Sequence, residues 1–117
     1  MNFTKLKLQD ALLIQPEIFS DNRGCFAESY NKKNFSEIFG KDINFVQDNY
    51  SKSKKNVLRG MHFQVNPKSQ GKLIEVISGE IFDVILDIRK SSKTFMQWEG
   101  IKLSSNTKKQ IWIPSGF

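Results

Sequence analysis

The sequence is poor in the residues that define several common classes of protein. Its 117 residues include one cysteine, Cys25, and one histidine, His62. A lone cysteine cannot close a disulfide within the chain, and no zinc-ligand spacing or His/Glu ligand cluster is present. No run approaches the roughly 18 apolar residues of a membrane-spanning helix, and residues 1–7 lack the apolar stretch of a signal peptide. We therefore expect a cytoplasmic chain with no membrane partner, no metal and no other cofactor.

The charge of the chain is basic but dispersed. Lysine and arginine outnumber aspartate and glutamate 18 to 12, which gives a net charge of +6. The lysines form only small clusters, at residues 32–33, 52–55 and 108–109, and no sustained basic block appears. Nucleic acid is therefore not an expected partner. An apolar content of 38%, with ten phenylalanines, suffices for the core of one domain spanning residues 1–117.

Most of the sequence alternates between apolar and polar residues, as half-buried strands do. One segment differs, because Phe35, Ile38 and Phe39 share a helical face within residues 31–40 and Gly40 suits the C-terminal cap. The pattern predicts an antiparallel β-sandwich or barrel with one short helix. The expected strands are residues 11–14, a hairpin over 18–30 that turns at Asp21–Gly24, and then 43–50, 57–63, 72–78, 81–89, 98–103 and 109–114.

The chain stops directly after an expected strand. Residues 113–117 read Ile-Pro-Ser-Gly-Phe, which is turn chemistry. A β-sandwich usually returns by a further hairpin to pair its open edges. We therefore expect that the domain lacks its C-terminal strands.

The stretch from Leu58 to Gln64 holds the only histidine. A strand here places Arg59 on one face and Gly60, His62 and Gln64 on the other. The bare glycine leaves room for a ligand beside the imidazole, a group that takes and returns protons near neutral pH. A histidine held by structural hydrogen bonds is the alternative.

Seven short motifs follow one another in order, at residues 19–28, 45–51, 58–64, 70–73, 79–84, 87–92 and 113–117. Together they resemble the N-terminal two-thirds of the dTDP-4-dehydrorhamnose 3,5-epimerase family. The resemblance implies a cupin, or jelly-roll, fold. It also implies a dTDP-4-keto-6-deoxyhexose substrate, a homodimer and a place in dTDP-L-rhamnose synthesis, which supplies cell-surface polysaccharides such as lipopolysaccharide.

The resemblance also implies roles for individual residues. His62 corresponds to the base that removes the protons at C3 and C5, and Lys72 to the cation that stabilises the resulting enolate. Arg59 and Arg23 correspond to residues that bind the diphosphate. Other family residues line the nucleotide and sugar site, and they correspond here to Phe19, Glu28, Gln47 and Asn49. In family dimers, Phe19, Arg23 and Glu28 act in the partner's site.

Three readings remain open at this point: the 3,5-epimerase, a related dTDP-ketosugar mono-epimerase, and an inactive nucleotide-binding module. The family's acid tyrosine and the aspartate that orients its base lie beyond Phe117. We therefore expect these 117 residues alone to show little activity. Asp83, Asp87 and Arg89 are also ambiguous, because they suit either a structural ion pair or the site.

Overall fold

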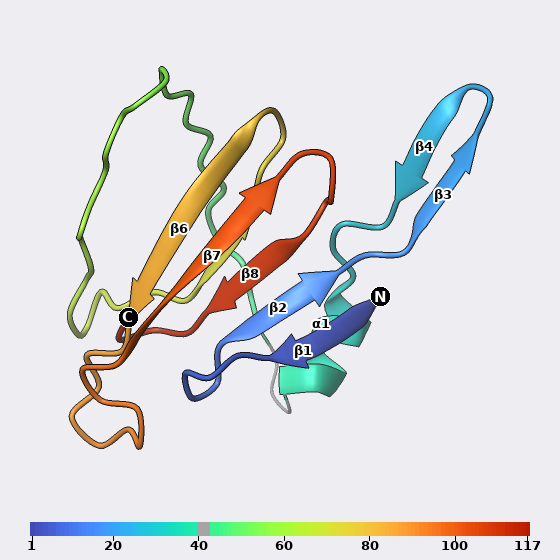
Figure 1. The fold of residues 1–117 in the computed structure, drawn as a ribbon. Helices are drawn as coiled ribbons and strands as arrows, with labels where there is room; N and C mark the ends of the chain where they lie inside the picture. Colours follow the sequence, from blue (N-terminus) through green and yellow to red (C-terminus); the bar gives the residue numbers. More distant parts are fainter. Residues whose placement is uncertain (40–42) are drawn as a thin grey trace. The chain divides into compact units, whose positions relative to one another are not determined.

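The computed structural model describes residues 1–39 and 43–117, and it is built mainly from short antiparallel strands (Figure 1). Two compact units are present, one formed by residues 1–29 with 63–117 and the other by residues 30–62. The part of the chain described here has no helix of the length and hydropathy needed to cross a bilayer. The elements in order are β1 (Asn2–Lys5), β2 (Leu12–Gln15), β3 (Ile18–Asp21), β4 (Gly24–Ala27), α1 (Lys32–Phe39), β5 (Lys72–Glu75), β6 (Glu80–Leu86), β7 (Trp98–Ser104) and β8 (Gln110–Ile113).

A four-stranded antiparallel sheet in the order β1-β2-β8-β5 forms the base of the larger unit. Its strand β8 is buried along its whole length. Ile111 and Ile113 point to one face and Gln110 and Trp112 to the other, because side chains alternate along a strand. Strand β1 was not expected from the sequence, since its four residues carry no apolar alternation and remain mostly exposed.

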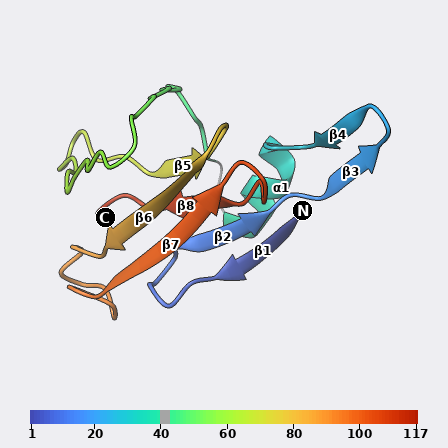
Figure 2. The same ribbon diagram turned by 45° about the horizontal axis from the view of Figure 1, so that its top comes forward.

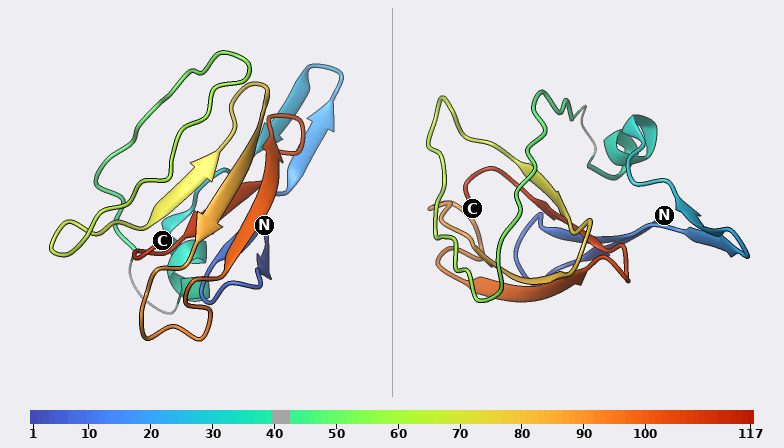
Figure 3. Two further views of the ribbon diagram at one scale, coloured as in Figure 1. Left: turned by 60° about the vertical axis from the view of Figure 1, so that its left-hand side comes forward. Right: turned by 90° about the horizontal axis from the view of Figure 1, so that it is seen from above.

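Strands β6 and β7 pair along seven residues and cover one face of this sheet (Figures 2 and 3). Ile85 and Leu103 belong to the same buried cluster as Ile111 and Ile113, so the two sheets enclose one apolar core. Burial of each such side chain stabilises the fold by about 1.5–3 kcal/mol. The sandwich of antiparallel strands expected from the sequence is therefore confirmed.

Strands β3 and β4 form a separate hairpin in the register that pairs Phe19 with Phe26. The predicted turn at Asp21–Gly24 is confirmed. Gly24 has φ +133°, a conformation that side-chain-bearing residues rarely adopt. The backbone N–H of Arg23 donates to Asp21 Oδ1 at 2.8 Å and closes the turn.

The smaller unit contains the predicted helix. Asn31 caps the N-terminus of α1, because its Oδ1 accepts hydrogen bonds from the backbone N–H groups of Lys33 and Asn34 at 3.1 and 3.4 Å. Phe35 is fully buried, and Tyr30 packs edge-on against Phe35. The expected apolar face is only partly buried, since Ile38 is exposed. The expected cap at Gly40 lies outside the described residues.

Two expected strands are absent from the described structure, and those two predictions are wrong. Residues 43–50 and 57–63 form no strand, and neither segment has a paired neighbour within residues 1–39 and 43–117. Val46 and Leu58 are 86% and 93% exposed. A strand requires a second strand for its backbone hydrogen bonds, so apolar alternation without that partner does not suffice. The faces expected for Arg59 and His62 are therefore not formed.

The structural ion pair suggested by the sequence is present between Asp87 and Arg89. Arg89 Nη2 lies 2.8 Å from Asp87 Oδ2, and its Nη1 lies 2.9 Å from Asp10 Oδ2. Ser92 and Thr94 donate hydroxyl hydrogen bonds of 2.6 and 2.7 Å to the same oxygen of Asp87. Burial alone would raise the pKa of Asp87, but these hydrogen bonds outweigh it and hold that pKa well below its usual range. Strand β6 ends at Leu86, before the predicted boundary at residue 89.

Replacement of this carboxylate is expected to destabilise the fold in a pH-dependent manner. Because the folded-state pKa lies below the unfolded value of about 3.9, the stabilisation is complete above that value and is lost as the pH falls below it. Asp87→Asn should lower the free energy of unfolding by about 3 kcal/mol at pH 7. The difference in the free energy of unfolding between the two proteins, measured by urea titration, should shrink progressively as the pH falls below about 4. The exposed control Glu37→Gln should change little, and a constant difference for Asp87→Asn at all pH values would contradict this account.

Candidate active site

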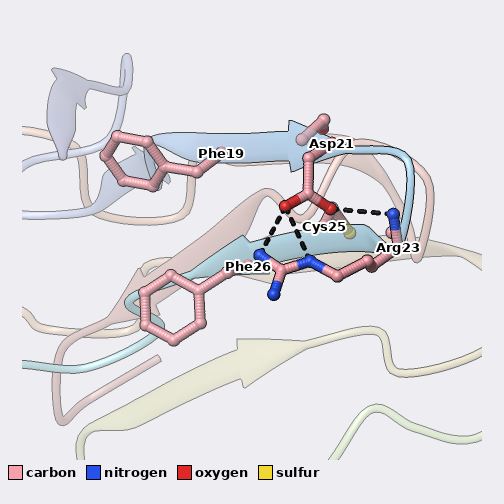
Figure 4. A pocket seen from close by; sticks show the side chains of 7 residues that line it. Phe19, Asp21, Arg23, Cys25 and Phe26 are labelled. Atoms are coloured by element: carbon pink, nitrogen blue, oxygen red, sulfur yellow. Dashed lines mark hydrogen bonds and ion pairs between the residues drawn. The ribbon is translucent and has the colours of Figure 1, made fainter.

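An open hollow of about 390 Å³ lies on the β3–β4 hairpin. Phe19 and Phe26 stand side by side across the hairpin, 57% and 70% exposed (Figure 4). Exposed aromatic rings on one face of a hairpin are suited to packing against a flat ring or an apolar surface. The hollow is lined by Phe19, Ser20, Asp21, Arg23, Gly24, Cys25 and Phe26.

Arg23 lies at the tip of this hairpin and is held by Asp21. Its Nη2 and Nε lie 2.6 and 3.0 Å from Asp21 Oδ2 (Figure 4). These hydrogen bonds, together with that from the backbone of Arg23, lower the pKa of Asp21. The guanidinium is otherwise exposed, so an incoming anion would meet a cation already oriented by its neighbour.

Four of the residues predicted for the site lie in the smaller unit. Gln47 Nε2 donates to Asn49 Oδ1 at 2.9 Å, and Arg59 Nε donates to Ser53 Oγ at 3.0 Å. His62 is exposed, as is every residue from 46 to 62. The structure thus joins Gln47 to Asn49 and presents the polar groups of this segment to solvent.

Lys72 begins strand β5 in the larger unit. Its positive charge acts on the pKa of Asp83, which lies on strand β6. Burial raises the pKa of Asp83, and the backbone of Val84 and the charge of Lys72 offset only part of that rise. Asp83 Oδ2 is buried and has no hydrogen-bond partner among the described residues. Lys72 and Asp83 are half-buried, so this pair differs from the solvent-facing groups around His62.

The predicted residues therefore fall into separate groups. Phe19 and Arg23 share the hairpin hollow, and Glu28 follows β4 at an exposed position. His62 and Lys72 belong to different units. Among residues 1–39 and 43–117, no three His, Cys, Asp or Glu side chains are grouped in a way that could hold a metal ion.

Residue-by-residue reasoning did not assign Phe26, Asp21, Cys25 or Asp83 to the site. The alternation across the turn was a usable signal for Phe26, because the hairpin register places it opposite Phe19. Asp83 also left a signal, as the one acidic residue inside the apolar run of residues 81–86.

Comparison with known proteins places these observations in one family. The family model for dTDP-4-dehydrorhamnose 3,5-epimerase matches residues 5–117. The protein of that name from Shigella flexneri is 53% identical over 117 residues, which are all of this chain and 65% of the relative. The chain thus spans just under two-thirds of the length of this curated relative.

Solved structures give the same result and confirm the cupin, or jelly-roll, fold class. A dTDP-4-dehydrorhamnose 3,5-epimerase from Elizabethkingia anophelis superimposes with a TM-score of 0.95 at 44% identity, covering 100% of this chain and 64% of that one. A dTDP-6-deoxy-D-glucose-3,5-epimerase from Legionella pneumophila, in complex with dTDP-4-keto-L-rhamnose, has a TM-score of 0.93 at 47% identity, covering 99% and 61%.

Proposed function

The chain belongs to the dTDP-4-dehydrorhamnose 3,5-epimerase family, and from this premise we propose that it epimerises a dTDP-linked 4-keto-6-deoxyhexose at C3 and C5. The observation that carries the proposal is the continuous match of residues 5–117, which include all eight residues predicted for the site. The proposed reaction places the chain in dTDP-L-rhamnose synthesis in the cytoplasm, upstream of cell-surface polysaccharides such as lipopolysaccharide.

The proposed chemistry follows from the ketone at C4 of the substrate. Hydrogens at C3 and C5 are both α to this carbonyl, so either can leave as a proton. The neutral imidazole of His62 takes the proton, and the electron pair of the broken C–H bond moves into a C=C bond as the C4 oxygen becomes an enolate. The enolate electrons then form a new C–H bond with a proton that solvent supplies on the opposite face of the carbon, the ketone is restored, and the epimer results. The ammonium of Lys72 stabilises the negative oxygen meanwhile.

The remaining predicted residues bind the nucleotide in this proposal. The guanidiniums of Arg59 and Arg23 donate paired hydrogen bonds to the diphosphate. Phe19 packs against a ring of the nucleotide, which its exposure on the hairpin supports. The hydrogen bond between Gln47 and Asn49 orients the two amides toward the substrate. Glu28 completes the set as an acceptor for sugar or base N–H and O–H groups.

We further propose a homodimer in which the hairpin reaches the neighbouring protomer. Strands β3 and β4 pair only with each other among the described strands. Burial of the exposed rings of Phe19 and Phe26 against a second chain would remove this apolar surface from water. Phe19, Arg23 and Glu28 then serve the partner's site.

Isotope exchange tests the reaction. In deuterated water with dTDP-4-keto-6-deoxyglucose, the chain should introduce deuterium at C3 and C5, at the low rate expected from the sequence, as followed by NMR. His62→Asn should slow exchange by about 10²–10⁴-fold, because the base is lost, while dTDP still binds. Exchange at C3 alone would favour a mono-epimerase. Binding without exchange would favour a nucleotide-binding module, and absence of both would contradict the proposal.

Calorimetry with dTDP tests the diphosphate site. Arg59→Ala should weaken binding by about 10–100-fold, because charge-assisted hydrogen bonds are lost. The matched control is Lys90→Ala, which removes an exposed positive charge outside the proposed site. Equal affinities for all three proteins would remove Arg59 from the binding role.

Sedimentation tests the dimer. Phe26→Ser should raise the dimer dissociation constant by about 100-fold or more, because each protomer loses a buried aromatic ring. Phe95→Ser, at an exposed aromatic residue away from the hairpin, should leave the dissociation constant unchanged. The homodimer would be refuted if the unaltered chain stayed monomeric at a protein concentration about 100 times the dissociation constant of a stable homodimer.

A further inference from the structure

Lys72 faces the core between the two sheets. It is opposite Ile113 in the β5–β8 register, and Ile74 of the same strand is opposite Ile111. Ile74 packs against the buried cluster that contains Ile111 and Ile113. Residues two apart on a strand share a face, so Lys72 begins at the same inner face as Ile74.

Asp83 faces the same core from the other sheet. It is paired with Ile101 on β7, and the next inward position of β6 is the buried Ile85. Ile101 packs against the cluster, and Leu103 of the same strand is fully buried within it. One positive and one negative side chain thus project from facing sheets into an otherwise apolar interior.

The surroundings of Asp83 oppose its charge. Its Oδ2 is buried without a hydrogen-bond partner among the described residues, and burial raises its pKa. Asp87, four residues further on, receives hydrogen bonds from Arg89, Ser92 and Thr94 instead. A carboxylate with one buried oxygen left unpaired is a poor structural device, because leaving a buried polar atom of a charged group unsatisfied is costly.

We infer that Asp83 is a positioning residue for Lys72, and this inference rests on the proposed function. The Asp83 carboxylate attracts the Lys72 ammonium across the gap between the sheets. This attraction holds the ammonium at the inner face of β5, where it meets the C4 oxygen as negative charge develops there. Asp83 itself touches neither substrate nor product.

The effect of Asp83 on stability distinguishes a positioning role from a purely structural one. Because the folded-state pKa of Asp83 is raised, its contribution to stability is present below the ordinary value of about 3.9 and is lost as the pH rises through the folded-state pKa. The ionised form of the carboxylate therefore opposes folding. Asp83→Asn should leave the protein as stable as before or more stable, whereas a structural role predicts a loss.

Carbon-13 NMR of the Asp83 carboxyl group tests the pairing without any measurement of activity. In Lys72→Met, the pKa of Asp83 should rise further, because the positive charge that lowers it is gone. Lys102→Met is the control, since Lys102 is exposed and pairs with Glu80. An Asp83 titration that is unchanged in Lys72→Met would overturn the inference.

Kinetics and urea unfolding test the positioning role in the full chain. Asp83→Asn should lower kcat by about 10–100-fold with KM within about twofold, because a displaced catalytic group chiefly affects the transition state. Its stability at pH 7 should not fall. Asp87→Asn should show the reverse, with lower stability and an unchanged kcat per folded molecule. Unchanged kcat in Asp83→Asn would overturn the positioning role.

Failure of the proposed function and failure of the inference about Asp83 can be distinguished. If the unaltered chain exchanges no deuterium, the proposed function fails, and the positioning role of Asp83 fails with it. The pairing of Asp83 with Lys72 is then decided by the titration alone. If the chain is active and the titration shifts but Asp83→Asn keeps full kcat, only the positioning role is refuted.

Discussion

The larger unit depends on the burial of strand β8 on both of its faces. Its neighbours β2 and β5 are aligned by this strand, and the facing β6–β7 pair closes over its inner side chains Ile111 and Ile113. Because a one-residue slip would turn every inward side chain outward, burial of both faces fixes the register of β5 tightly. That register decides which face Lys72 takes. A core strand without catalytic residues thus determines where the candidate catalytic lysine lies.

Much of the local structure was predictable because it depends on neighbours in the sequence. The β3–β4 hairpin follows from turn residues, the helix α1 from apolar spacing, and strands β2, β5, β6, β7 and β8 from alternation between turns. Residues 43–50 and 57–63 show where such reasoning stops. Alternation records which side chains would share a face, but a strand also needs a partner for its backbone. Strand β1 shows the converse. Its sequence lacks the alternation that would predict a strand, but β2 pairs with its backbone.

The candidate site was predictable as a set of residue types and less so as an arrangement. The motifs led to His62, Lys72 and Arg59, but they carried no information on which groups contact one another. Only the structure shows that Arg23 is held by Asp21 or that Gln47 donates to Asn49. These contacts are formed by side chains whose geometry depends on the hairpin and on the smaller unit, so sequence spacing alone does not specify them.

The two aspartates of residues 81–89 show why a buried charge in a sequence is ambiguous. Both interrupt apolar runs, and in both cases the charge of a cation favours the ionised form. Asp87 receives hydrogen bonds from several donors and its pKa is lowered, so its ionised form stabilises the fold. Asp83 keeps an open oxygen and its pKa is raised, so its ionised form opposes folding. A carboxylate of the second kind, whose pKa is raised by burial and partly lowered again by the charge of a lysine on the facing sheet, is explained more readily by what that lysine does than by the stability of the sheets.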